Sequence, residues 1–312
     1  MKKYYITLLI FIGYFFTNAQ NLSYLDQDSF DFKKNETYGV NERNTFDIIL
    51  PKSDKQTPLV IFIHGGGFKK GRKEKLYVRE KDIAYFVKHK IAVATVNYQY
   101  RQDNDSLGVK RCINDVQKAI QYIRHHAKTY NLDKTKLACY GSSAGAGMSL
   151  YFAFQDDSKI IGDTTAIGES TRLTCAGAIA TQATYDVFQW EEFIPYLGFF
   201  ILLKKAAFYE MAANFYGYET YEDFEPSKNT ICKSLDMLTM IDSNDPPIYL
   251  QNTLEKTFPT NNNIIQHHKN HAITVGEKLD AVKVSNIVIT HETNSKEKKY
   301  PIYQFITEQL QK

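Results

Sequence analysis

Residues 136–147 read Lys-Leu-Ala-Cys-Tyr-Gly-Ser-Ser-Ala-Gly-Ala-Gly, and the fold that we predict follows from them. An apolar run over 136–140 precedes the pattern G-x-S-x-G, which places Ser143 between Gly141 and Gly145. Glycines on both sides of a serine let the chain turn sharply from strand to helix, which leaves the serine Oγ exposed above a sheet. The stretch therefore predicts a strand, a tight turn that carries an exposed hydroxyl, and a helix.

A second glycine-bearing stretch, His64-Gly65-Gly66-Gly67, follows another apolar run. Because glycine has no Cβ, the backbone N–H groups there can approach a negative charge that develops on an oxygen atom. The stretch can supply part of an oxyanion hole. Together with Ser143 it predicts a serine hydrolase.

Apolar strand runs alternate with helical patterns along the chain. Runs 59–63, 91–96 and 136–140 are short and continuous, as expected for parallel strands buried on both faces. Residues 109–123 repeat apolar side chains at intervals of three and four, which is typical of a helix with one apolar stripe. Further elements are expected as strands at 45–50, 176–183, 248–251 and 285–290, and as helices at 144–154 and 301–310. We predict an α/β fold with a doubly wound, mostly parallel sheet.

Residues from about 187 to 235 interrupt this alternation and carry many aromatic side chains. We interpret 20–312 as a single α/β domain, with 187–235 as a helical lid insertion. Within the insertion, 196–203 is apolar nearly all round and is followed by Lys204 and Lys205. Two interpretations stay open for this run: a packed helix, or a lid whose inner face forms an acyl or aryl pocket.

The first 19 residues have the zones of a signal peptide: two lysines, an apolar run and small residues before the expected cleavage after Ala19. An uncleaved anchor is the alternative, although the apolar run is shorter than the roughly 20 residues of a membrane-spanning helix. Cleavage removes two lysines and no acid, so the formal net charge falls from +3 to +1. We expect a secreted or periplasmic protein without a nucleic-acid partner and without a membrane span in the mature form.

Four cysteines are compatible with an oxidising compartment but are too few to define a disulfide framework in 312 residues. We interpret Cys112 and Cys139 as buried thiols. Cys175 and Cys232 flank the insertion, and a bridge between them stays an open alternative.

A serine nucleophile needs a base within hydrogen-bond reach and an acid that orients the base. His291 directly follows the late strand run, where a sheet presents residues at its carboxyl edge, so it is the predicted base. His267, His268 and His271 fall in one expected helix, and their HHxxH spacing raises metal ligation as an alternative. His271 is the substitute if His291 is not the base.

Glu255 lies four residues beyond the strand run 248–251 and is the predicted acid. Asp242, Asp245 and Asp280 are weaker substitutes, and an ordinary solvated glutamate is the alternative for Glu255 itself. With these residues the chain order would be serine, acid, histidine, as in α/β-hydrolases.

Together these residues resemble the α/β-hydrolase fold and, within it, carboxylesterases of the hormone-sensitive-lipase type and the related feruloyl- and acetyl-esterase-like group. The resemblance runs from residue 38 to residue 247 through the two glycine-bearing stretches and Asp115. It implies oxyanion donors at the N–H groups of Gly66, Gly67 and Ala144, and a structural role for Asp115. It weakens toward the C-terminus, where Glu255 replaces the usual aspartate and no glycine adjoins His291.

The predicted function is hydrolysis of carboxylic esters through an acyl-enzyme intermediate, on small or glycan-linked substrates, without a metal or organic cofactor. A peptidase or amidase on the same fold is one alternative. A catalytically silent binding protein of this fold is the other, and the departures at the acid and base positions favour it.

Overall fold

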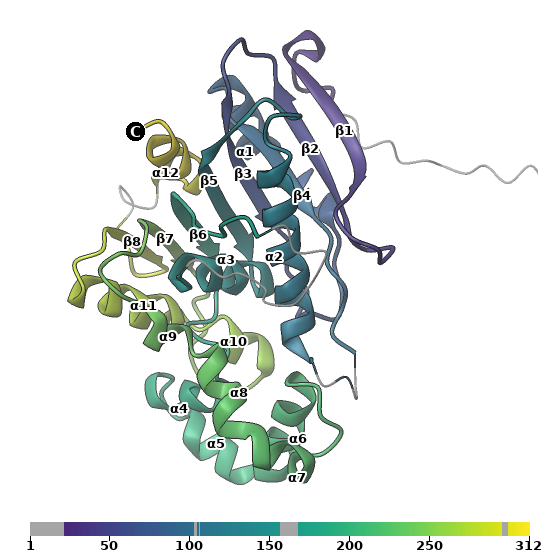
Figure 1. Cartoon of the computed structure of the whole chain (residues 1–312). Helices are drawn as coiled ribbons and strands as arrows, with labels where there is room; N and C mark the ends of the chain where they lie inside the picture. Colours follow the sequence, from purple (N-terminus) through teal and green to yellow (C-terminus); the bar gives the residue numbers. More distant parts are fainter. Residues whose placement is uncertain (1–21, 103–104, 106, 157–167, 295–298) are drawn as a thin grey trace, which may run out of the picture.

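The computed structural model describes residues 22–102, 105, 107–156, 168–294 and 299–312 (Figure 1). The predicted signal peptide, residues 1–19, lies outside the described residues. Among the described residues, no helix has the length and apolarity needed to cross a membrane.

A single eight-stranded sheet organises the described part of the chain. Neighbouring strands are β1 (Phe30–Thr37), β2 (Thr45–Pro51), β4 (Ala92–Val96), β3 (Thr57–Ile63), β5 (Leu132–Ser142), β6 (Cys175–Ile179), β7 (Ile248–Asn252) and β8 (Asn286–Thr290). β2 pairs antiparallel with both β1 and β4, and every other neighbouring pair is parallel. The predicted α/β class with a mostly parallel sheet is confirmed.

The sequence analysis did not predict β1, and it extended β6 too far. β1 is an edge strand whose side chains are mostly exposed, so it lacks the apolar run that marks a buried strand. β6 ends at Ile179, and Ala180 then adopts a φ of 53°, which breaks the extended backbone. The apolar residues that follow β6 are buried in loop structure.

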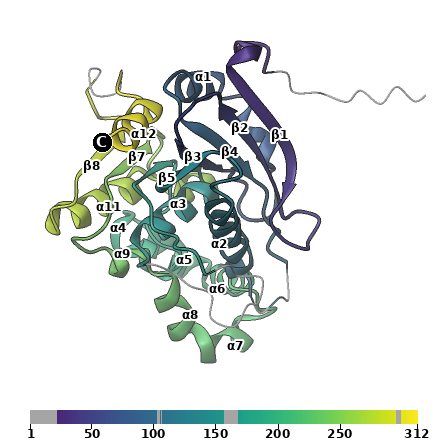
Figure 2. The ribbon, with the colours of Figure 1, turned by 45° about the horizontal axis from the view of Figure 1, so that its top comes forward.

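Helices cover both faces of the sheet. α1 (Glu80–Lys88) and α12 (Ile302–Leu310) pack on one face, and α2 (Val109–His125), α3 (Ala144–Phe154) and α11 (Lys269–Ala281) pack on the other. In Figure 2, α1 lies on one side of the sheet and α2 on the other. The predicted apolar stripe of α2 is buried at Val109, Ile113, Val116, Ile120 and Ile123.

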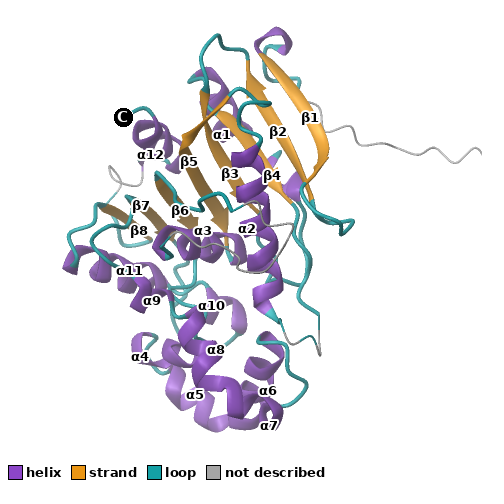
Figure 3. Cartoon of the chain, viewed as in Figure 1, coloured by secondary structure: helices purple, strands orange, loops and turns teal. Residues whose placement is uncertain are grey.

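Short helices occupy the chain between β6 and β7. They are α4 (Trp190–Phe193), α5 (Leu197–Leu203), α6 (Lys205–Phe215), α7 (Tyr221–Phe224), α8 (Lys228–Leu235) and α9 (Met237–Met240), with 3₁₀ turns at Val187–Gln189 and Glu225–Ser227. Figure 3 shows α4 to α8 gathered beyond one end of the sheet. Aromatic rings hold them together: Phe188 and Tyr216 both stack on Phe224.

Of the two interpretations offered for 196–203, the packed helix is realised on one face only, where Leu197 is buried and Ile201 packs against the core. Tyr196, Phe199, Leu202 and Leu203 are between 60% and 71% exposed, so the helix is not packed all round. The wall of the main cavity is made by the flanking elements η3 (Val187–Gln189), α4 and α6, and not by α5. A short apolar helix with one buried leucine can therefore remain at the surface.

All four cysteines are buried free thiols. The prediction for Cys112 and Cys139 is confirmed, and the alternative of a bridge between Cys175 and Cys232 is not realised. Burial raises the pKa of the Cys232 thiol to about 12, which keeps it protonated at neutral pH.

Asp115 on α2 has the structural environment that the resemblance implied. Its carboxylate accepts from Asn44 Nδ2 at 2.8 Å and from the backbone N–H of Gln99 at 2.8 Å. These bonds tie the segment after β4 to α2 and to the turn before β2.

Candidate active site

Ser143 stands at a strained turn between β5 and α3. Its backbone has φ 55° and ψ −122°, a conformation that non-glycine residues rarely adopt. A Cβ on Gly141 would lie 2.4 Å from the carbonyl carbon of Gly145, and a Cβ on Gly145 would lie 2.0 Å from Ile63 O. The two glycines therefore permit the close backbone approach that this turn requires.

The Ser143 hydroxyl is paired with a histidine from the loop between α10 (Asn262–Gln266) and α11. His267 Nε2 lies 2.9 Å from Ser143 Oγ. On the other side of the ring, His267 Nδ1 donates to Asn263 Oδ1 at 3.0 Å. This bond fixes the proton on Nδ1, so Nε2 presents its lone pair to the serine hydroxyl.

Three buried side chains hold the loop that carries His267. The carbonyl of Ile265 accepts from His271 Nε2 at 2.9 Å. The carbonyl of Gln266 accepts from Gln182 Nε2 at 2.7 Å, and that of His268 accepts from Asn252 Nδ2 at 3.0 Å. The backbone on both sides of His267 is therefore fixed by partners on β7, α11 and the loop after β6.

Burial lowers the pKa of His267 below the ordinary 6.5, and hydrogen bonding to the backbone of Asn263 only partly opposes this. At neutral pH the imidazole is therefore unprotonated. A neutral imidazole with a free lone pair at Nε2 is the form that can accept a proton from Ser143.

The second glycine-bearing stretch forms a tight loop after β3. Gly66 has φ 134° and Gly67 φ 60°, and a Cβ on Gly66 would lie 1.8 Å from Lys70 O, so glycine is required there. The far end of the loop is fixed because Gly71 O accepts from both Arg43 and Tyr100. The loop brings Gly67 to the cavity that Ser143 lines.

Ala144 is the first residue of α3, so its backbone N–H has no partner within the helix. Ala144 and Gly67 line the same cavity as Ser143. A carbonyl carbon at Ser143 would place its oxygen beside these two elements, where backbone N–H groups can stabilise negative charge.

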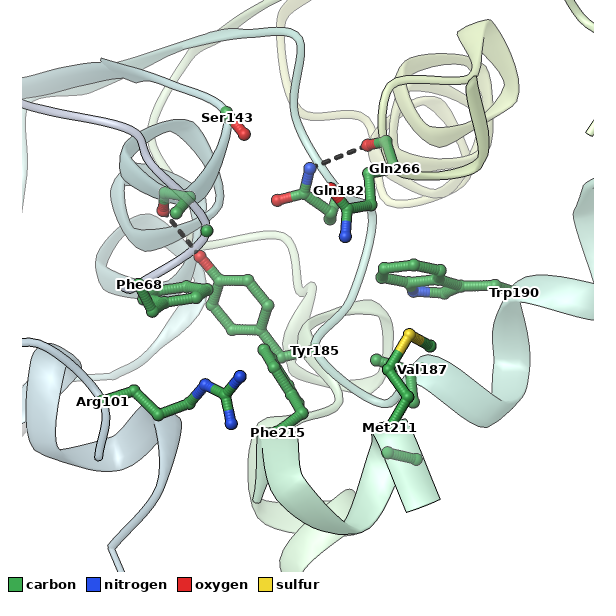
Figure 4. A pocket seen from close by; sticks show the side chains of 13 residues that line it. Phe68, Arg101, Ser143, Gln182, Tyr185, Val187, Trp190, Met211, Phe215 and Gln266 are labelled. Carbon is green, nitrogen blue, oxygen red and sulfur yellow. Dashed lines mark hydrogen bonds between the residues drawn. The ribbon is translucent and has the colours of Figure 1, made fainter. Parts of the chain in front are cut away.

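The cavity beside Ser143 has a volume of about 120 Å³ and is largely apolar. Figure 4 shows Tyr185, Phe215 and Met211 opposite Ser143, with Trp190 at one side. The Tyr185 hydroxyl donates to Ala144 O at 2.9 Å, which fixes one wall against the start of α3. Arg101 supplies the one charged side chain among the described lining residues.

The remaining predicted site residues lie elsewhere. Glu255 is an exposed residue of the loop after β7, and no hydrogen bond or ion pair joins it to another described residue. His291 follows β8, and its described ion pair is with Glu292 at 3.5 Å. Neither side chain has a described hydrogen bond to Ser143 or His267.

The substitute acids also have other surroundings. Asp245 precedes β7 and so lies toward the opposite end of this strand from Asn252 and the loop that carries His267, where burial raises its pKa to about 6. Asp280 accepts from Asn286 Nδ2 at 2.7 Å. Asp242 accepts from the backbone N–H of Asn244 at 2.6 Å.

We had expected the three histidines of HHxxH to lie in one helix, and the structure shows that they do not. His267 is the residue after α10, His268 is the residue before α11, and His271 lies inside α11. His271 uses both ring nitrogens, because Nδ1 accepts from Ala183 N at 3.1 Å while Nε2 donates to Ile265 O. Within the described residues, no group of three or more His, Cys, Asp or Glu side chains could hold a metal ion.

A family model named BD-FAE matches residues 46–260, which contain both glycine-bearing stretches, Ser143 and Glu255. The chain belongs to the BD-FAE family. The matched range ends before His267, so the loop that supplies the histidine lies outside the part that this BD-FAE protein shares with its family model. No curated protein matches the chain.

Solved structures share the fold of this BD-FAE family member at low sequence identity. A truncated carbohydrate esterase from gut microbiota has 16% identity and a TM-score of 0.61, over 92% of this chain and 99% of that chain. Esterase B from Lactobacillus rhamnosis has 14% identity and a TM-score of 0.60, over 91% and 87%. An acetyl ester-xyloside bifunctional hydrolase from Caldicellulosiruptor lactoaceticus has 15% identity and a TM-score of 0.56, over 86% of each chain. The fold is that of α/β-hydrolases.

The sequence analysis did not select His267 and Asn263. Their signal was the cluster of histidines and asparagines over 261–271, which was considered for metal binding and, through His271 alone, for a substitute base. Nothing in the local pattern indicates which of these side chains meets a serine 124 residues earlier.

Proposed function

We propose that this protein hydrolyses carboxylic esters with Ser143 as nucleophile and His267 as general base. The observation that carries the proposal is the 2.9 Å hydrogen bond between Ser143 Oγ and His267 Nε2, at the wall of an apolar cavity. The unprotonated state of His267 and the glycine loop beside the serine support it.

In the first step Ser143 Oγ attacks the ester carbonyl carbon while His267 Nε2 takes the hydroxyl proton. The backbone N–H groups of Gly66, Gly67 and Ala144 are the proposed donors to the resulting oxyanion. His267 then protonates the leaving alcohol as the carbon–oxygen bond breaks, which leaves an acyl group on Ser143. Water, deprotonated by His267, then attacks the acyl carbonyl carbon. The bond from this carbon to Ser143 Oγ breaks, and His267 returns the proton to Oγ, which releases the acid and restores the serine.

His267 takes the role that the sequence analysis gave to His291, and Asn263 takes the orienting role given to Glu255. An amide oxygen fixes the imidazole tautomer as a carboxylate would, but it offers no full charge to the imidazolium that forms. We therefore propose a site that orients its base without a carboxylate partner.

A fluorophosphonate probe and a series of nitrophenyl esters of increasing acyl length test the nucleophile. The unaltered protein should label and turn over ester, and Ser143→Ala should lose labelling and kcat on the order of a million-fold. A folded wild-type protein that neither labels nor hydrolyses any ester of the series would favour the catalytically silent alternative. Turnover of matched anilides would favour the amidase alternative.

A pair of histidine variants tests the base. His267→Ala should lose kcat to a similar extent as Ser143→Ala, because the two residues act as one unit. His291→Ala is the matched control and should retain most of the activity. The opposite result would return the role of base to His291.

The substrate class stays open between small and glycan-linked esters. Two solved structures of the same fold are described as a carbohydrate esterase and an acetyl ester-xyloside hydrolase, so acetylated xylosides belong in the assay beside the nitrophenyl series. The small apolar cavity favours short acyl groups over long chains.

We further propose export of the protein, on the basis of the charged and apolar zones in residues 1–19. Mass spectrometry of the protein from the periplasm or medium of its producing cell should find Gln20 at the N-terminus. An intact Met1 in the membrane fraction would instead support the uncleaved anchor.

A further inference from the structure

The most concentrated apolar surface on the described part of the molecule is centred on α5. Tyr196, Phe199, Leu202, Leu203 and Phe258 are 67%, 60%, 71%, 63% and 54% exposed, and we name these five residues the α5 patch. Among the described residues, most of the large hydrophobic side chains that are at least 54% exposed belong to this patch.

The α5 patch is continuous although its members come from two segments. The ring of Phe258, in the loop after β7, lies 5.5 Å from that of Tyr196 and 5.5 Å from that of the half-buried Phe200. Phe199, Leu202 and Leu203 follow one another at helical spacing on the outer face of α5. At about 200 Å² for a large side chain, the exposed fractions leave roughly 600 Å² of apolar surface, the upper end for a soluble monomer.

Cationic side chains adjoin the patch at the C-terminal end of α5. Lys204 and Lys205 are both exposed, and Lys256 is exposed in the loop that carries Phe258. Glu191 and Glu192 lie on α4, and Glu191 packs beside Gly198 near the other end of α5. Glu210 on α6 and Glu255, next to Lys256, are also exposed. Exposed apolar area and neighbouring lysines supply the two contributions that bind a protein to a membrane interface, burial of apolar surface and attraction to anionic lipids.

The patch also adjoins the cavity of the candidate site. α5 joins α4, which supplies Trp190 to the cavity wall, to α6, which supplies Met211. Met211 is itself 40% exposed, so it belongs both to the cavity and to the outer surface. Figure 3 shows α5 beside α6 and α7 at the lower end of the insertion, away from the sheet.

We propose that the α5 patch docks the protein on an anionic lipid surface. Phe199, Leu202 and Leu203 enter the boundary between headgroups and acyl chains, and Lys204 and Lys205 contact the lipid phosphates. The proposal concerns binding and holds whether or not Ser143 is a nucleophile.

Sedimentation with lipid vesicles tests the proposal on the full purified chain. Vesicles of phosphatidylcholine alone and of phosphatidylcholine with phosphatidylglycerol are compared. Binding is expected to the anionic vesicles and to weaken as salt is added. Leu202→Ser with Leu203→Ser should abolish it, while Val78→Ser, a change at a residue 81% exposed elsewhere, should leave it unchanged.

A charge-matched pair of double variants isolates the lysines. Lys204→Gln with Lys205→Gln should lower partitioning onto the anionic vesicles by roughly 25-fold, about fivefold for each lysine. Lys33→Gln with Lys34→Gln removes the same charge from the exposed edge strand β1 and should have little effect. All variants carry the same apolar residues 6–16, so binding by that segment would be equal in each.

Three results would overturn the proposal: no binding to anionic vesicles, equal binding by all variants, or a dimer that the Leu202 and Leu203 substitutions dissociate. The last result would assign the patch to a second copy of this chain. Turnover of a soluble short ester by the same variants distinguishes failure of the membrane-docking proposal from failure of the proposed ester hydrolysis. Ser143→Ala should bind vesicles normally without hydrolysing ester, and the patch variants should do the reverse.

Discussion

In the mechanism that we propose, His267 and Asn263 set the pH dependence of the site. Because burial lowers the pKa of His267 below 6.5, the imidazole is already unprotonated at pH values where an exposed histidine is still charged. The Asn263 amide lies 3.0 Å from Nδ1 and carries no charge that would raise this pKa again. A site of this kind works as a base from mildly acidic pH upward.

We expect kcat/KM to rise with pH through an apparent pKa below 6.5 and to reach a plateau by neutral pH. In Asn263→Asp a carboxylate would stabilise the imidazolium, so the rise should move to higher pH. Asn262→Asp, at an exposed position on the same helix, is the control and should leave the profile in place. An unshifted profile in Asn263→Asp would show that residue 263 does not touch the base.

At the scale of elements, the loop between α10 and α11 is positioned by the strand β7. Asn252, the last residue of β7, is 1% exposed. Its Oδ1 accepts from Thr181 N at 2.8 Å, and its Nδ2 donates to Thr181 O and to His268 O, each at 3.0 Å. One buried amide therefore links the end of β7, the loop after β6 and the loop that carries His267.

Asn252→Ala should lower the free energy of unfolding by about 1–3 kcal/mol, because buried backbone groups lose their partners. It should also lower kcat, because a displaced His267 no longer meets Ser143. Urea unfolding and ester turnover measure the two effects. Gln251→Ala, on the opposite face of the same strand, should change both only slightly, and loss of stability with unchanged kcat in Asn252→Ala would argue against a positioning role.

At the scale of the whole molecule, His271 is the point where the insertion, the sheet and α11 meet. Its ring is fully buried, lies edge-on to Trp190 and Phe193, and bonds to Ala183 N and Ile265 O. Burial lowers its pKa to about 3. The folded protein therefore holds this histidine neutral well below the pH at which an unfolded chain would protonate it.

The sign of the pH effect follows from this lowered pKa. The contribution of His271 to stability is fully present above pH 6.5 and is lost as pH falls from 6.5 toward 3, because the unfolded chain binds the proton first. We expect the difference in unfolding free energy between the unaltered protein and His271→Gln to shrink over that range in urea titrations. Carboxyl groups contribute equally to both proteins, so a constant difference would contradict the assignment.

The sequence by itself determined the buried sheet, because parallel strands covered on both faces need continuous apolar runs, and these are local patterns. It also marked the glycines at 66, 141 and 145, where a Cβ would lie within 2.5 Å of backbone atoms, and Gly67, whose positive φ favours glycine. It did not indicate β1, whose polar residues become a strand only by pairing with β2.

Only the tertiary structure decided which histidine meets Ser143. The chain has eight histidines. Which of them contacts Ser143 depends on the position of the loop after α10 in the folded protein, and not on the sequence of that loop. Buried donors from Gln182, Asn252 and His271 fix that loop, and they come from segments far apart in the chain. The exposure of α5 was likewise decided by tertiary structure. An apolar run shows that a helix has side chains suited to burial, but it does not show whether another element packs over them.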